Sequence, residues 1–232
     1  MASDANWIWP IAAAPVVGAL LTLIVAGVPV LRSQPAPSVR RPWPTIGDDE
    51  AGDEIGLHAA AYSVAAGIVA AWAATATGGW LAWLSCGFGW LLLSLAIIDL
   101  RYFLLPNFLT APLFVLGFAV TWVAMPEAVL SHVIGAVGGF GFFAIGRELY
   151  FRLRGHEGLG LGDAKLMAGL GAWLGWEALP GIVLVAAGIG LMAAGCHLLR
   201  GGKLQSDLRL PFGACLALGG WIAWLHGPLV IG

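Results

Sequence analysis

Long apolar runs recur along this chain and limit what it can fold into. A helix needs about 20 apolar residues to cross a bilayer. The composition agrees, because 59% of the 232 residues are hydrophobic and 10% are charged, whereas about 25% of the residues in a soluble domain are charged. The sequence therefore predicts an all-α, polytopic membrane protein with about eight transmembrane helices. They are expected at residues 8–31, 58–77, 80–98, 108–125, 129–146, 164–179, 181–199 and 212–230.

The positive charges lie on one side of this predicted membrane arrangement. When the loops are numbered alternately, one set contains every Lys and Arg and the other set contains none. The positive-inside rule makes the charged side cytoplasmic, so both termini are predicted outside. The residues of the charged side are Arg32, Arg40, Arg41, Arg101, Arg147, Arg152, Arg154, Lys165, Arg200, Lys203 and Arg209.

One segment, residues 32–57, differs from the rest in composition. It is rich in proline and acidic residues and has too few apolar residues for a core. Such a segment is typical of a mobile linker, although a partner-binding role stays open. We therefore expect a first transmembrane helix at 1–31, a short cytoplasmic polar loop at 32–57 and a membrane-embedded core at 58–232.

Two aspartates are the candidate functional residues. Asp99 ends the third apolar run and Asp163 begins the sixth. Carboxylates are costly inside apolar helices and mark functional sites by default, although a carboxylate can also simply cap a helix N-terminus. Two further crossings separate the residues, so the predicted topology returns both to the cytoplasmic surface.

A facing pair of carboxylates has a specific chemical use. Two like charges at short distance share one proton near neutral pH. The charged member can then take a proton from water while the neutral member protonates or polarises a carbonyl. Asp99 and Asp163 therefore suggest the chemistry of an aspartic protease, in which water is the nucleophile and no metal is needed.

The glycines before Asp163 are suited to a substrate chain that approaches the carboxylate closely. Three alternating glycines precede it, Gly158, Gly160 and Gly162. Backbone without side chains lets another chain come close and allows positive φ angles. A phosphate-binding interpretation is poor, because the phosphate loop requires Gly-Lys-Ser/Thr.

Three more polar or turn-forming positions accompany the aspartates. Pro106 and Asn107 follow Asp99 and indicate either a turn or the start of the fourth helix. Lys165 follows Asp163 by two residues. It could tune the charge of the pair or steer an anionic group, or it could be an interfacial anchor that snorkels.

Together these motifs resemble those of the prepilin peptidases, also called type IV leader peptidases, of the Gly-x-Gly-Asp membrane aspartic protease class. The likeness covers about residues 58–230 and includes the order and spacing of the motifs. The matching motifs are Asp99-x6-Pro106-Asn107, Gly158-x-Gly160-x-Gly162-Asp163-x-Lys165-Leu166 and Pro211-Phe212-Gly213.

The resemblance implies a function. Enzymes of this family cut the short basic leader from type IV prepilins or pseudopilins after a Gly at the cytoplasmic face, and Asp99 and Asp163 match their catalytic pair. The implied location is the bacterial inner (plasma) membrane, with the active site toward the cytoplasm. The implied partners are prepilin or pseudopilin substrates, membrane lipids and, indirectly, pilus or type II secretion machinery; no nucleic acid is expected.

The chain departs from the bifunctional members of that family. Those members carry paired Cys-x-x-Cys motifs after the first span and also N-methylate the product with S-adenosylmethionine. Residues 32–57 contain no cysteine, and Cys86, Cys196 and Cys215 lie singly in apolar runs. We therefore expect a peptidase that needs no metal or other cofactor, and no role for S-adenosylmethionine.

Two other function classes remain open on the sequence alone. A transporter or proton-coupled channel could use the aspartates as relay groups, although transport sites usually lie near the bilayer midplane. An inactive assembly or scaffold protein of a pilus or secretion machine is the other alternative, and the intact pair of aspartates argues against it. Replacing either aspartate separates these hypotheses.

Overall fold

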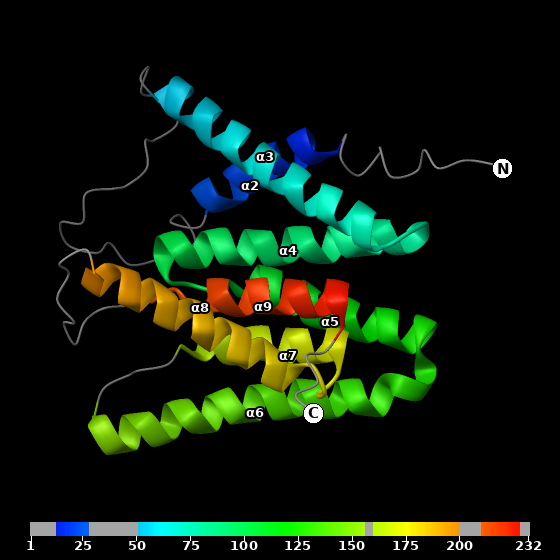
Figure 1. The fold of residues 1–232 in the computed structure, drawn as a ribbon, viewed down its shortest axis with the longest axis vertical. Helices are drawn as coiled ribbons and strands as arrows, with labels where there is room; N and C mark the ends of the chain where they lie inside the picture. Colours follow the sequence, from blue (N-terminus) through cyan, green and yellow to red (C-terminus); the bar gives the residue numbers. More distant parts are fainter. Residues whose placement is uncertain (1–12, 28–50, 156–159, 200–209, 228–232) are drawn as a thin grey trace. The chain divides into compact units, whose positions relative to one another are not determined.

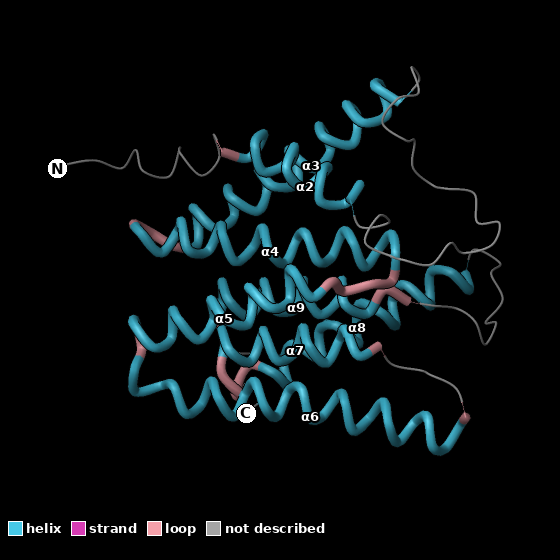
Figure 2. The backbone as a smooth tube through the Cα atoms, turned by 180° about the vertical axis from the view of Figure 1, so that it is seen from behind, coloured by secondary structure: helices cyan, strands magenta, loops and turns pink. Residues whose placement is uncertain are grey.

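The computed structural model describes residues 13–27, 51–155, 160–199 and 210–227 (Figure 1). These residues form α-helices joined by short turns, and no strand occurs among them (Figure 2), which confirms the predicted all-α class. The helices are α2 (Ala14–Gly27), α3 (Ala51–Ala76), α4 (Trp80–Tyr102), α5 (Asn107–Ala124), the 3-10 helix η3 (Pro126–Ala128), α6 (Val129–Arg154), α7 (Leu161–Leu174), α8 (Leu179–Leu199) and α9 (Phe212–His226).

Among the residues that the structure describes, five helical segments are long and apolar enough to cross a membrane, which supports a multi-pass membrane protein. They are His58–Ala76, Trp80–Tyr102, Asn107–Ala124, Pro126–Leu153 and Leu179–Cys196. The other three predicted spans coincide with the shorter helices α2, α7 and α9 among the described residues. Glycines with positive φ follow two of them, Gly175 (φ 75°, ψ 174°) after α7 and Gly227 (φ 83°, ψ 173°) after α9. Residues with a side chain rarely adopt such a conformation, and a hydropathy pattern does not register it.

The structure places the start of α3 and the end of α6 at other residues than the apolar runs predicted. Helix α3 begins at Ala51, so residues 51–57 of the expected loop at 32–57 are helical. Helix α6 continues eight residues past the predicted end at residue 146 to Arg154. Residues 28–50, which make up most of the predicted loop, lie outside the described residues.

The chain divides into two compact units, Met1–Ser94 and Leu95–Gly232. In the first unit α2 packs against α3. A Cβ on Gly18 would collide with Ser63 of α3, and the indole of Trp90 donates a hydrogen bond to the Ala66 carbonyl at 3.1 Å. The domain limits expected at residues 31 and 57 stay a prediction.

The second unit is built around α7. This helix packs against α5, α6, α8 and α9, and both views place it between α6 and α9 (Figures 1 and 2). Ten of its 14 residues are buried. A helix that other helices surround in this way gains its stability from packing rather than from length.

Glycines bring α6 and α7 into close contact. A Cβ on Gly135 would lie 2.8 Å from the Gly175 carbonyl carbon, and a Cβ on Gly139 would lie 2.9 Å from the Met167 carbonyl oxygen. Small residues at helix contacts allow such close backbone approach in membrane proteins. This contact fixes the axis of α7, and hence the place of the residues at its beginning.

Candidate active site

The carboxylate of Asp99 lies at the beginning of α9. Asp99 is on the last turn of α4 and is 5% exposed. Its Oδ2 accepts a hydrogen bond from the Ala214 backbone N–H at 2.9 Å, and the Gly213 N–H also hydrogen-bonds to this carboxylate. The first amides of a helix have no partner within the helix and carry partial positive charge. The start of α9 therefore holds Asp99 in place.

This contact explains the Pro211-Phe212-Gly213 segment. Pro211 immediately precedes α9. A Cβ on Gly213 would lie 2.9 Å from Asp99 Oδ2 and 2.8 Å from Leu105 Cδ1. Any larger residue at this position would push the carboxylate away from the amides that hold it.

Asp163 is held in a similar way at the beginning of α7. It is the third residue of that helix and is 9% exposed. The backbone N–H of Gly160, which immediately precedes the helix, hydrogen-bonds to its carboxylate. Gly162 packs on Leu105. Gly158, the first of the predicted glycines, lies outside the described residues.

The structure brings the two carboxylates into electrostatic contact. Asp163, which lies outside the five candidate spans, has a raised pKa. Burial is the largest cause and the neighbouring Asp99 carboxylate is the second, whereas the hydrogen bond from the Gly160 N–H lowers the pKa by less. The two Asp side chains thus form a buried pair of like charges, and such a pair titrates as one unit. The thiol of Cys215 on α9 is within electrostatic reach of both carboxylates.

The remaining predicted residues lie beside this pair. Pro106 occupies the position before α5 and Asn107 is its first residue, so the pair marks a helix start. The Lys165 ammonium donates a hydrogen bond to Asn107 Oδ1 at 2.7 Å. This exposed bond ties α7, near its beginning, to the first residue of α5.

Sequence reasoning missed one residue at this site, Leu105. Its side chain is 8% exposed and packs on both Gly162 and Gly213. A leucine in an apolar chain carries no distinguishing pattern. The only signal was its position between Asp99 and the Pro106-Asn107 motif.

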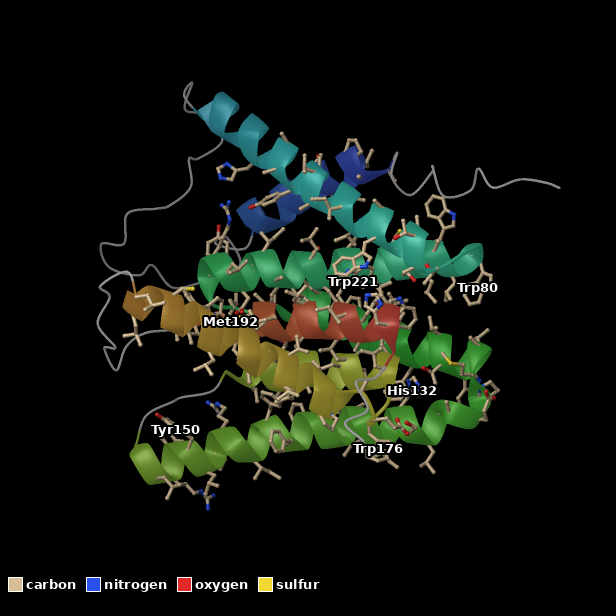
Figure 3. The ribbon with its side chains drawn as sticks, in the orientation of Figure 1. Trp80, His132, Tyr150, Trp176, Met192 and Trp221 are labelled. Carbon is tan, nitrogen blue, oxygen red and sulfur yellow. The ribbon has the colours of Figure 1, made fainter. Side chains whose placement is uncertain are left out.

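A second buried polar cluster lies elsewhere in the same unit. His132 Nδ1 is 3.0 Å from Thr121 Oγ1 and 2.9 Å from the Ala172 carbonyl oxygen. Nearby, Ser131 donates a hydrogen bond to Glu177 at 2.6 Å, and this bond is the main cause of a lowered pKa of Glu177. Figure 3 shows His132 and Trp176 toward one end of α6 and Tyr150 toward the other end.

Comparison with known proteins connects this geometry to a family. Residues 86–195 match the model of the type IV leader peptidase family, and this segment contains both Asp99 and Asp163. The chain is 44% identical over 129 residues to a prepilin leader peptidase/N-methyltransferase of Burkholderia pseudomallei (strain 1026b), covering 56% of this chain and 41% of that protein.

Two further relatives with the same name show similar values. The protein of Aeromonas hydrophila is 41% identical over 61% of this chain and 48% of its own length. That of Pseudomonas aeruginosa is 38% identical over 61% of this chain and 48% of its own length. No solved structure matches the chain. The chain thus spans about half the length of the curated relatives it matches. The predicted resemblance to the type IV leader peptidases is confirmed, and residues 86–195 are the segment that matches their family.

Proposed function

We propose that this protein is an aspartic endopeptidase of the membrane that removes the short basic leader from type IV prepilins or pseudopilins, cutting after a Gly. Asp99 and Asp163 act together on one water molecule. One carboxylate takes the proton of the attacking water, and the other, in its neutral form, donates a hydrogen bond or a proton to the scissile carbonyl. The proton taken from water then passes to the leaving nitrogen as the C–N bond breaks, so that the new amine stays on the pilin and the new carboxyl end leaves with the leader.

The observation that supports this proposal best is the pairing of two buried carboxylates at two helix beginnings. Asp99 is held by amides of α9, and Asp163 is held by the Gly160 N–H before α7. These contacts orient both groups before substrate arrives. Groups that are oriented in advance stabilise a transition state without reorganising during the reaction.

The protonation of the pair suits hydrolysis. Burial and the charge of Asp99 both raise the pKa of Asp163. The pair therefore keeps one proton to a higher pH than two separate carboxylates would. One proton on two carboxylates is the state in which one member is a base and the other an acid.

The proposal places the site at the cytoplasmic face of the bacterial plasma membrane. All Lys and Arg residues lie on the side of the predicted topology that includes Asp99 and Asp163, and such a bias marks the cytoplasmic side. A leader with basic residues would remain on that side for the same reason. The partners in this proposal are prepilins or pseudopilins, in surrounding lipid.

The proposal includes peptidase activity alone. The curated relatives are named as peptidases and N-methyltransferases, but the chain covers about half of their length. Within this sequence the three cysteines are Cys86, Cys196 and Cys215, and no Cys-x-x-Cys pair occurs. We therefore propose no metal site, no other cofactor and no use of S-adenosylmethionine for this chain.

The test is cleavage of a prepilin-like peptide by the purified protein in lipid. The peptide has a basic leader that ends in Gly, followed by Phe and an apolar helix, and the products are identified by mass spectrometry. The proposal predicts one cut after the Gly. Folded protein that leaves several such peptides intact would contradict it, and a product that gains the mass of one methyl group with S-adenosylmethionine would contradict the restriction to peptidase activity.

A further inference from the structure

We propose that Leu105 is a positioning residue that sets the separation of the two carboxylates. Its side chain lies between the beginnings of α7 and α9 and acts as a spacer between them. This inference rests on the proposed function and adds to it a residue that touches neither substrate nor water.

The contacts of Leu105 place it between the two helix beginnings. A Cβ on Gly162 would lie 2.9 Å from Leu105 Cβ and 3.1 Å from its Cδ1. A Cβ on Gly213 would lie 2.8 Å from the same Cδ1. One leucine side chain therefore packs directly on the backbone of both helices, and glycine at both positions makes the contact sterically allowed.

Each of the two glycines is adjacent in sequence to a residue that either bears one of the carboxylates or holds one by a hydrogen bond. Gly162 is followed by Asp163 itself. Gly213 is followed by Ala214, whose N–H holds Asp99 at 2.9 Å. A displacement of Leu105 therefore moves the backbone at both members of the pair.

The backbone on either side holds Leu105 at this place. Phe103 has φ 50° and is the one residue other than glycine with positive φ among those that the structure describes. Its N–H donates to the Asp99 carbonyl at 2.9 Å, so the chain turns sharply at the end of α4. Pro106 then fixes the backbone after Leu105. A costly left-handed conformation persists only where the surrounding structure requires it.

The separation of the carboxylates matters for the proposed reaction. Catalytic groups need to be held within about 0.5 Å of their productive geometry. Besides the two aspartates, the thiol of Cys215 on α9 is within electrostatic reach of both carboxylates, and Lys165 on α7 bonds to Asn107. Without the leucine side chain the two helix beginnings can shift, and water can reach the carboxylates.

The first experiment compares Leu105→Ala with Leu105→Met and with Leu113→Ala. Leu113 is fully buried and packs on Gly169 of α7, so Leu113→Ala is the same truncation away from the carboxylates. Leu105→Ala is expected to lower kcat for the prepilin-like peptide by roughly 10- to 100-fold with little change in KM, because misplacement by about 1 Å costs up to about 100-fold. Leu105→Met is expected to recover most of this loss.

The pH profile separates positioning from mere stability. Burial is the largest cause of the raised pKa of Asp163. Hydration through the gap in Leu105→Ala should therefore move the high-pH limb of kcat to lower pH. Leu113→Ala lowers stability and should leave this limb where it is. Equal limbs in both variants would overturn the assignment of Leu105 as a positioning residue.

A second experiment uses the different neighbours of the two glycines. The three atoms nearest to a Cβ on Gly162 all belong to Leu105, whereas the three nearest to a Cβ on Gly213 belong to Leu105 and Asp99. Adding Leu105→Ala should therefore recover more of the cleavage lost in Gly162→Ala than of that lost in Gly213→Ala. Equal recovery in the two pairs, or none in either, would contradict the spacer.

A measurement that does not depend on cleavage keeps this inference separate from the proposed function. The carboxyl bands of the folded protein are titrated by infrared difference spectroscopy, and Asp99→Asn and Asp163→Asn identify them. The pair has two apparent pKa values, and the higher one should fall in Leu105→Ala and stay unchanged in Leu113→Ala if Leu105 is a spacer. This expectation holds even if the wild type cuts no prepilin-like peptide. An unchanged titration in Leu105→Ala would overturn the inference even if the wild type cleaves.

Discussion

The two buried polar clusters of the second unit, which involve the same helix α7, differ in the kind of partner that each polar group has. In the histidine cluster, His132 has neutral partners, Thr121 and the Ala172 carbonyl. In the carboxylate cluster, Asp99 and Asp163 are two like charges, each with backbone amides as partners. Both clusters are buried and hydrogen-bonded.

This comparison separates structural from functional burial. Hydrogen-bonded polar groups without a like-charged neighbour fix the packing of helices at modest cost, and His132 and Thr121 connect α5, α6 and α7 in this way. Two neighbouring carboxylates instead oppose each other's ionisation, which costs stability and serves no purpose in packing. The carboxylate cluster is therefore the candidate for chemistry, although both clusters contain titratable side chains.

The largest effect should follow from removing either charge of the carboxylate cluster. Asp99→Asn or Asp163→Asn should slow cleavage of the prepilin-like peptide by at least about 100-fold, because positioned acid–base groups contribute about 100- to 10,000-fold. The matched control is Glu177→Gln near the histidine cluster, which should cleave like the wild type. Loss of cleavage in the control as well would remove the contrast between the clusters.

The next effect concerns the contact that aligns α6 with α7. A Cβ on Gly171 would lie 2.6 Å from the Ala136 backbone nitrogen, whereas a Cβ on Gly138 meets nothing within 4 Å. Gly171→Ala should destabilise the fold by about 1–3 kcal/mol, as overpacking does, and Gly138→Ala should stay within about 0.5 kcal/mol of the wild type. Thermal unfolding in detergent measures both, and similar midpoints for the two variants would contradict the close crossing.

Breaking the histidine cluster should cost stability without changing the chemistry. His132→Ala removes one hydrogen-bonding partner of two buried oxygen atoms, which keep their hydrogen bond to each other. A hydrogen bond lost in this way costs about 0.5–1.5 kcal/mol. The thermal midpoint should fall, while both limbs of the pH profile of cleavage keep their positions. A moved limb would mean that the two clusters are coupled.

The smallest effect is a dependence of stability on pH. Because the pKa of Asp163 is raised in the folded protein, the folded state keeps this proton above the ordinary carboxyl pKa of about 3.9. The free energy of unfolding should therefore fall as pH rises from that value through the raised pKa. Asp163→Asn should remove this fall, so the variant should be more stable than the wild type at alkaline pH and no more stable at acidic pH.

Thermal midpoints of Asp163→Asn and the wild type across pH provide the measurement. A difference that stays constant with pH would show that Asp163 titrates in the folded protein as it does in the unfolded chain. Asp99→Asn is the useful comparison, because it removes the neighbouring charge while Asp163 and its burial remain.

Much of the fold and the pairing of the two aspartates could be predicted, because both follow from sequence patterns that extend over many residues. Apolar runs predicted where helices form, and counting crossings predicted that Asp99 and Asp163 meet. The helix ends were harder to predict, because Gly175 stops α7 through a local backbone conformation and α6 extends through charged residues to Arg154.

The part of the site that could not be predicted depends on tertiary contacts. The amide of Ala214 holds Asp99 across 115 positions of sequence, and a backbone N–H has no signature in a sequence. Leu105 has the same difficulty, since it differs from other leucines only by what it touches. Asp163 could be found because a carboxylate in an apolar chain is costly and therefore rare.

The most direct test of the central claim is a double-mutant cycle on the carboxylates. Cleavage of the prepilin-like peptide is measured for the wild type, Asp99→Asn, Asp163→Asn and the double variant, each checked for folding by its thermal midpoint. Residues that act as one unit show strongly non-additive losses. The account predicts that the double variant is no slower than the slower single variant, whereas losses that multiply would show that the two carboxylates act independently and would contradict it.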